Sequence, residues 1–135
     1  MYYIGLMSGT SMDAVDAALV EFDKKATLKF YNEYPLEISV KNQICQINEK
    51  SNLVDVAMLD NKLGYIFADA ANDLVKKADI NSNQVAAIGS HGQTILHVPT
   101  IAEKTSIQIS DPNIICAKTG ITVVADFRRM DMAFG

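Results

Sequence analysis

YYIGLMSGTSMDAVDAALVEF, residues 2–22, decides how the fold begins, because two apolar runs flank a short stretch of small polar residues. Tyr2 to Met7 predicts a strand that ends in the turn-rich residues 8–11. Val15 to Phe22 predicts a second strand, and both of its alternating faces are largely apolar, which is typical of a strand covered on both sides. The stretch therefore predicts two strands joined by a glycine- and serine-rich loop.

The next part of the chain changes from strand to helix spacing. After the polar turn at residues 23–25, Leu28 to Tyr34 predicts a third strand and completes an antiparallel meander. Apolar residues then recur at every third or fourth position. This spacing predicts a short helix within Ser39–Glu49 and a long amphipathic helix over Val54–Ala78.

The remaining chain predicts two more strands around a third helix. Val85 to Ile88 is a short apolar run, and Ile121 to Phe127 is rich in β-branched residues, as buried strands are. Between them, Asp111 fits a helix N-cap, Pro112 the first helical position and Gly120 a C-cap. The order β-β-β-α-β-α-β predicts a ribonuclease-H-like α/β fold, with helices packed on one mixed five-stranded sheet.

Length, charge and apolar content indicate the number of domains and the kinds of partner to expect. The 135 residues fit a single domain, residues 1–135, and the net charge of −4 argues against a nucleic-acid partner. No segment approaches the ~20 apolar residues of a membrane span, so the expectation is a cytoplasmic protein. Cys45 and Cys116 are far apart and form no zinc motif, so we expect two buried, reduced thiols.

The loop after the first strand is the first candidate site. Its small residues would let a phosphate approach closely, and its N–H and hydroxyl groups could donate to phosphate oxygens. Asp13 and Asp16 could order Mg²⁺ through water, since this ion prefers carboxylate oxygen. An ordinary hairpin with glycine and serine in its turn is the alternative. The loop matches neither a Walker A motif nor GxGxxG.

Three further segments follow strands and could meet a ligand. Gly89–Thr94 would place His91 at the carboxyl edge of the sheet, as a ligand-binding or a structural histidine. Gln108–Asn113 reads locally as a helix cap. Arg128 and Arg129 could clamp an anion, or they could pair with an aspartate at the surface.

Taken together, three blocks resemble successive signatures of anhydro-N-acetylmuramic acid kinases, which are bacterial sugar kinases of the actin/hexokinase-like class. They are GLMSGTSMDAVDAALVEFD (5–23), AIGSHGQTILHVPT (87–100) and SIQISDPNIICAKTGITVVADFRRMDMAFG (106–135). The resemblance runs from Ile4 to Gly135, with a loose match over residues 27–83, and it corresponds to the N-terminal lobe of an actin-like kinase.

The resemblance implies a site and a reaction. ATP would bind at Gly9, Thr10, Ser11, Met12, Asp13, Ala14, Val15 and Asp16, with Mg²⁺ at Asp13. The amino-sugar substrate would face His91, Gln93, Thr94, Arg128 and Arg129. Members of the family hydrolyse the 1,6-anhydro bond and phosphorylate the 6-oxygen, giving N-acetylmuramic acid 6-phosphate during cell-wall recycling. The intact protein is expected to be a homodimer.

The sequence also departs from the family pattern. Ala14 and Ser110 stand where family members usually have glycine, so a position that needs positive φ would be strained. No residue matches the family's general base, which is expected beyond Gly135 with a second lobe. An inactive remnant that only binds or dimerises is therefore an alternative. A metal hydrolase that uses Asp13 and Asp16, with Asp126 as a third carboxylate, is another.

Overall fold

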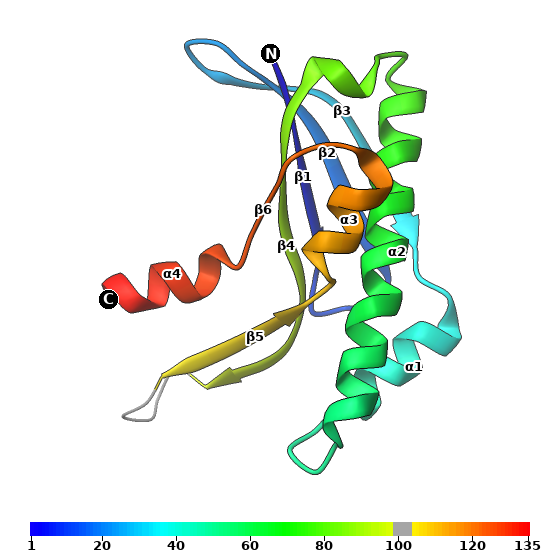
Figure 1. Ribbon diagram of the computed structural model, residues 1–135, viewed down its shortest axis with the longest axis vertical. Coiled ribbons are helices and arrows are strands. Elements are labelled where there is room, and N and C mark those ends of the chain that lie inside the picture. The colour runs from blue at the N-terminus through cyan, green and yellow to red at the C-terminus, as the bar shows by residue number, and fades with distance from the viewer. Residues whose placement is uncertain (99–103) are drawn as a thin grey trace.

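The chain folds around one six-stranded mixed sheet in the computed structural model, which describes residues 1–98 and 104–135. The predicted meander is confirmed, because β1 (Tyr2–Ser8), β2 (Ala14–Phe22) and β3 (Ala26–Pro35) pair antiparallel in succession. The other elements are α1 (Ile38–Gln46), α2 (Leu53–Lys77), the 3₁₀ turn η1 (Ser82–Gln84), β4 (Val85–Val98), β5 (Thr105–Ile109), α3 (Pro112–Thr119), β6 (Val123–Ala125) and α4 (Phe127–Phe134) (Figure 1).

Strand β4 organises the sheet because it pairs with three other strands. The order is β3-β2-β1-β4-β5, and β6 also pairs with β4. Along one edge of β4 lies β1, in parallel. Along the other edge, β6 runs parallel beside residues 88–90 and β5 runs antiparallel beside residues 93–98. The α/β class is confirmed, whereas the predicted count of five strands is wrong for the described residues.

The core lies between the sheet and its helices. Helix α2 starts where Asn52 accepts a hydrogen bond from the N–H of Asp55, and its buried stripe includes Leu63, Phe67 and Leu74. These side chains pack on the inward positions of β1 and β2, and each contributes about 1.5–3 kcal/mol by leaving water. Figure 1 shows α1, α2 and α3 on one side of the sheet and α4 on the other.

Only one face of β2 is buried, so the prediction of a strand covered on both sides is wrong. Val15, Ala17 and Leu19 are buried, and the residues between them are partly exposed. Apolar side chains on this other face of the sheet reach solvent, such as Tyr3 of β1 and Phe22 of β2, whose rings lie edge to face at 6.4 Å.

The largest corrections concern the second half of the chain. β4 extends to Val98 instead of ending at Ile88, because β1, β6 and β5 hold its small polar residues in an extended conformation. β5 was not predicted. The last strand is shorter than predicted: Ile121–Phe127 contains only β6, and Phe127 begins α4.

The predicted ends of helix α3 are confirmed, whereas the predicted burial of the cysteines is wrong. Asp111 caps α3 by accepting the N–H of Asn113 at 2.8 Å, and Gly120 ends the helix in the left-handed conformation, as predicted. Cys45 and Cys116 are both exposed, so the prediction of buried thiols is wrong, although both are free. Among the described residues, no helix is both long and apolar enough to span a bilayer.

Candidate functional site

The four predicted segments converge beside the middle of β4. The register places Gln93 between Ser8 at the end of β1 and Ile109 at the end of β5. Three residues earlier, Ser90 lies opposite Ala125, the last residue of β6. The segments that follow β1, β5 and β6 therefore start close to residues 90–93. These residues form the middle of a strand, so the prediction of a loop at 89–94 is wrong.

The β1–β2 loop is a tight turn that projects two hydroxyl side chains. The N–H of Met12 donates to the carbonyl of Gly9 at 3.2 Å, which leaves the exposed residues Thr10 and Ser11 at the tip. Met12 takes a positive φ of 54°. Ala14 is in β2 and is not among the residues with positive φ, so the expected strain at this position is absent.

Asp13 is the exposed carboxylate of this loop. It accepts a hydrogen bond from the ammonium of Lys41 on α1, and this contact holds the pKa of Asp13 below its ordinary value. The carbonyl of Asp13 accepts the N–H of Leu36 at 2.8 Å, just before α1. Local sequence did not indicate Lys41, because its partner lies 28 residues away.

Asp16 has a different environment. It is on β2, where the hydroxyl of Tyr31 donates to it at 2.6 Å and to Glu33 at 2.8 Å. The two carboxylates raise the pKa of Tyr31. Among residues 1–98 and 104–135, no three His, Cys, Asp or Glu side chains gather to hold a metal, so Asp13, Asp16 and Asp126 do not form the cluster that a metal hydrolase would need.

Buried polar groups lie behind the loop. Ser8, Ser90 and Gln93 are each no more than 2% exposed. The amide of Gln93 donates to the carbonyl of Thr94 at 3.2 Å and approaches that of Gly9 at 3.5 Å. The hydroxyls of Ser8 and Ser90 and the side-chain oxygen of Gln93 have no hydrogen-bond partner within the described part of the chain. Buried polar atoms are seldom left unpaired, so these groups could meet a ligand or water.

The β4–β5 hairpin carries a polar network that the sequence did not reveal. The amide of Gln108 donates to the hydroxyls of Ser106 at 2.6 Å and Thr94 at 3.2 Å. The Ser106 hydroxyl donates to the carbonyl of Leu96 at 3.2 Å and lies 3.2 Å from Nδ1 of His97. Thr94, one of the predicted sugar-binding residues, is therefore held by a neighbouring strand.

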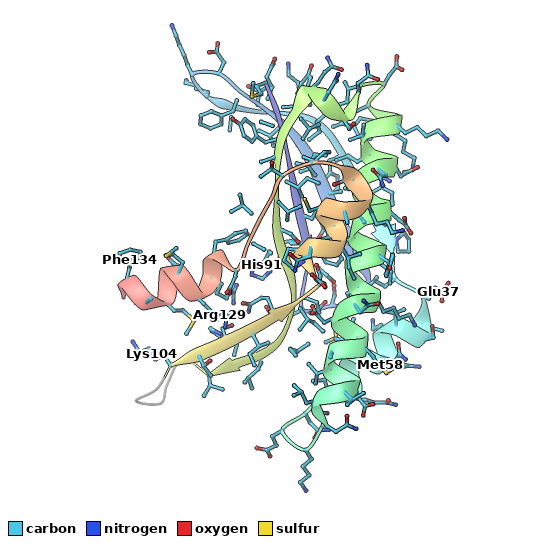
Figure 2. The ribbon with its side chains drawn as sticks, in the orientation of Figure 1. Glu37, Met58, His91, Lys104, Arg129 and Phe134 are labelled. Carbon is cyan, nitrogen blue, oxygen red and sulfur yellow. The ribbon has the colours of Figure 1, made fainter. Side chains whose placement is uncertain are left out.

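His91 lies at an irregularity in β4 and faces α4. The pairing of β4 with β1 skips His91, because Leu6 pairs with Ser90 and Met7 pairs with Gly92. The His91 Nδ1–H donates to the carbonyl of Gly92 at 3.2 Å. Its ring lies 6.0 Å from that of Phe127, and its Nε2 is buried without a partner among the described residues. Figure 2 shows His91 between the sheet and α4 (Figure 2).

The two arginines belong to helix α4 rather than to a loop. Arg129 binds Asp126 through two guanidinium nitrogens, which lowers the pKa of the aspartate, so the surface-pair alternative describes this residue. Arg128 is half-buried and is in no ion pair of the described residues. The structure brings His91 and α4 to the same region, whereas Gln93 is enclosed.

The turn between β5 and α3 is strained at Ser110. This residue has a φ of 140°, a region that favours glycine, and its buried hydroxyl has no partner in the described residues. Asp60 on α2 holds the turn by accepting the N–H of Ser110 at 2.7 Å, and its burial raises its pKa. The expected strain at Ser110 is therefore confirmed.

The residues of the β1–β2 loop are chemically suited to a nucleoside triphosphate and Mg²⁺. Space around Gly9 is open, because no described residue other than its two chain neighbours has an atom within 4 Å of where a Cβ would be. The hydroxyls of Ser8, Thr10 and Ser11 are donors suited to phosphate oxygens. Asp13 supplies the single exposed carboxylate that Mg²⁺ needs beside phosphate ligands.

Comparison with known proteins shows the family of this chain. The family model for anhydro-N-acetylmuramic acid kinase matches residues 1–135. Relatives named anhydro-N-acetylmuramic acid kinase include those of Vibrio vulnificus strain YJ016 (46% identical over 136 residues), Sulfurovum sp. strain NBC37-1 (48% over 135) and Shewanella loihica (47% over 138). These alignments cover 98–99% of this chain but only 37–38% of each relative. The chain belongs to the anhydro-N-acetylmuramic acid kinase family.

Proposed function

We propose that this chain is the phosphate-binding part of an ATP-dependent kinase for 1,6-anhydro-N-acetylmuramic acid. The observation that carries the proposal is the β1–β2 loop. Its turn presents Thr10 and Ser11 at the tip and the Asp13 carboxylate beside them, and behind them lies the Ser8 hydroxyl, which has no partner among residues 1–98 and 104–135. ATP would bind over residues 9–16, and Mg²⁺ at Asp13 would neutralise part of the triphosphate charge.

In the proposed reaction, water adds to C1 as the 1,6-anhydro bond opens. The freed 6-oxygen receives the γ-phosphoryl group of ATP, and the products are N-acetylmuramic acid 6-phosphate and ADP. Phosphoryl transfer depends mainly on positioning and on electrostatic stabilisation. The loop of this chain would supply both for the phosphates. The general base that takes the proton of water would come from the remaining length that the relatives possess.

The sugar would lie across β4 toward α4. The Nε2 of His91 there has no partner in the described part of the chain, and Thr94 is held by Gln108. Arg128 and Arg129 would bind the carboxylate of the lactyl group or the developing phosphate charge. Gln93 would connect the sugar end of the site with the carbonyl of Gly9, because its side-chain oxygen has no partner among the residues that the structure describes.

We propose further that the fold is ribonuclease-H-like, as in actin-like ATPases. The order β3-β2-β1-β4, with β6 parallel on the far edge of β4, supports this assignment. Residues 1–135 would then form one domain, the N-terminal lobe, and a second lobe would close over the nucleotide. The intact kinase would act as a cytoplasmic homodimer in cell-wall recycling.

A chimeric kinase tests the proposal. It joins this chain to the remaining C-terminal part of the Vibrio vulnificus strain YJ016 relative. With ATP, Mg²⁺ and the anhydro-sugar, the chimera should form ADP and the 6-phosphate in equal amounts, and Asp13→Asn should lower kcat/KM by about a hundredfold. The 135-residue chain alone should form neither product. A folded chimera without turnover would favour the inactive remnant instead.

A further inference from the structure

Helix α1 is attached to the β1–β2 loop by several contacts. The N–H of Leu36 donates to the carbonyl of Asp13 at 2.8 Å. The sulfur atoms of Met12 and Cys45 lie 3.7 Å apart. Val40 of α1 is 1% exposed and belongs to the same buried cluster as side chains of α2 and the sheet. The backbone that carries Lys41 therefore lies beside the loop.

Lys41 supplies the positive charge that the loop itself lacks. Residues 8–16 contain two aspartates and no basic residue. In the described part of the chain, the ion pair between Lys41 and Asp13 is the only one that joins a cation to this loop. The Lys41 side chain is 34% exposed and that of Asp13 is 63% exposed, so both can reach a ligand from solvent.

We propose that Lys41 is a positioning residue for the nucleoside triphosphate, an inference that rests on the proposed function. Without nucleotide, its ammonium neutralises Asp13. When Mg²⁺ binds the Asp13 carboxylate, the cation and the ammonium compete for the same oxygens, and Lys41 moves to a phosphate oxygen. The long, flexible lysine side chain allows this exchange without moving α1.

The exchange solves an electrostatic problem of the loop. A triphosphate beside two carboxylates would be repelled, because like charges at such short distances disfavour binding. Mg²⁺ at Asp13 removes part of this repulsion and at the same time releases Lys41. A single ion pair thus supplies both the metal ligand and a phosphate donor, and binding of Mg²⁺ to the first makes the second available.

Binding to the isotopically labelled 135-residue chain tests this inference without relying on catalysis. Dissociation constants come from ¹⁵N–¹H shifts of the Thr10 and Ser11 amides during titration with MgATP and with Mg²⁺ alone. Lys41→Met should weaken MgATP binding by about tenfold, because one charge-assisted hydrogen bond is lost. The same variant should bind Mg²⁺ alone severalfold more tightly, because no ammonium has to be displaced. Opposite shifts of the two constants would not follow from a structural role.

Two controls make the result specific. Lys41→Arg should keep MgATP binding within about threefold, because it keeps the charge. Lys29→Met removes a similar exposed pair, with Glu21 at 2.7 Å near the other end of β2, and should change neither constant. If the dissociation constant of Lys41→Met for MgATP or for Mg²⁺ equals that of the unsubstituted chain, the inference about Lys41 is wrong, whereas the proposed function is unaffected. An unsubstituted chain whose loop does not respond to MgATP would overturn both the inference and the proposed function.

Discussion

Replacing Ser110 with glycine should stabilise this protein, although glycine usually destabilises folded proteins. Ser110 has a φ of 140°, and strain of this kind costs about 1–3 kcal/mol. Its buried hydroxyl is unpaired among the described residues, which costs about 1–3 kcal/mol more. Glycine loses about 1 kcal/mol through the greater freedom of the unfolded chain. With both costs near their lower ends, the net gain is about 1–2 kcal/mol.

Urea denaturation of the purified chain measures this gain. At this chain length, 1 kcal/mol corresponds to a rise of about 3–6 °C in Tm, so thermal unfolding gives an independent value. Ser110→Ala removes the hydroxyl but keeps the Cβ, and should recover only part of the gain. Ser39→Gly, at an exposed position of α1, should instead lose about 0.5–1 kcal/mol.

The comparison of the three variants decides the cause. A Ser110→Gly variant that is clearly more stable than Ser110→Ala shows that the backbone at this turn is strained. If the two are equally stable, the hydroxyl explains the gain and the strain argument is wrong. A Ser110→Gly variant less stable than the unsubstituted chain would refute both parts of the reasoning.

Three other predictions follow from close contacts, burial and charge. Gly92→Ala should destabilise the chain by about 2 kcal/mol or more in urea denaturation, because residue 92 has a φ of 74° and the new Cβ would lie 2.6 Å from the carbonyl oxygen of Ile109. Gly89→Ala should cost far less, because its Cβ would lie 3.9 Å from the carbonyl oxygen of Ile4. Burial raises the folded pKa of Asp60, so its carboxyl contributes most stability below its ordinary value of 3.8 and loses this contribution as the pH rises through the folded value. In urea titrations, the free energy of unfolding of the unsubstituted chain minus that of Asp60→Asn should therefore fall across this pH range. A difference that does not change with pH would show that the pKa of Asp60 is not raised. In the chimera, Arg128→Ala should lower kcat/KM for the sugar more than Arg129→Ala, because Arg129 already binds Asp126; unchanged values in both would exclude the anion clamp.

Local sequence signals were sufficient where one element determines its own conformation. The meander was predictable because its apolar runs are separated by strong turn residues, and α2 because its apolar stripe repeats over 25 residues. The ends of α3 were predictable for the same reason, since Asp111 and Gly120 act on the nearest backbone groups. These are interactions within a few residues of each other.

The missed elements depend on partners that are distant in sequence. Residues 89–94 contain small polar residues typical of a loop, but β1, β5 and β6 pair with them on both edges. β5 is short and polar, so only its pairing with β4 makes it a strand. In α4, Arg128 and Arg129 read equally well as a loop, because the helix buries no residue completely.

The candidate site shows the same division. The loop at residues 8–16 was predictable, because its chemistry is carried by consecutive small and acidic residues. Lys41 and Asp60 were not, because they contact Asp13 across 28 residues and Ser110 across 50. The fold alone brings them to the site, and no local pattern distinguishes them from other charged residues on amphipathic helices.

A crystal structure of the chimera with Mg²⁺ and a non-hydrolysable ATP analogue tests whether the β1–β2 loop binds the triphosphate. We expect the triphosphate at the β1–β2 loop, within hydrogen-bonding distance of Thr10 and Ser11 and with Mg²⁺ bound through Asp13. A triphosphate bound elsewhere on this chain, or bound with no contact to residues 8–16, would contradict it.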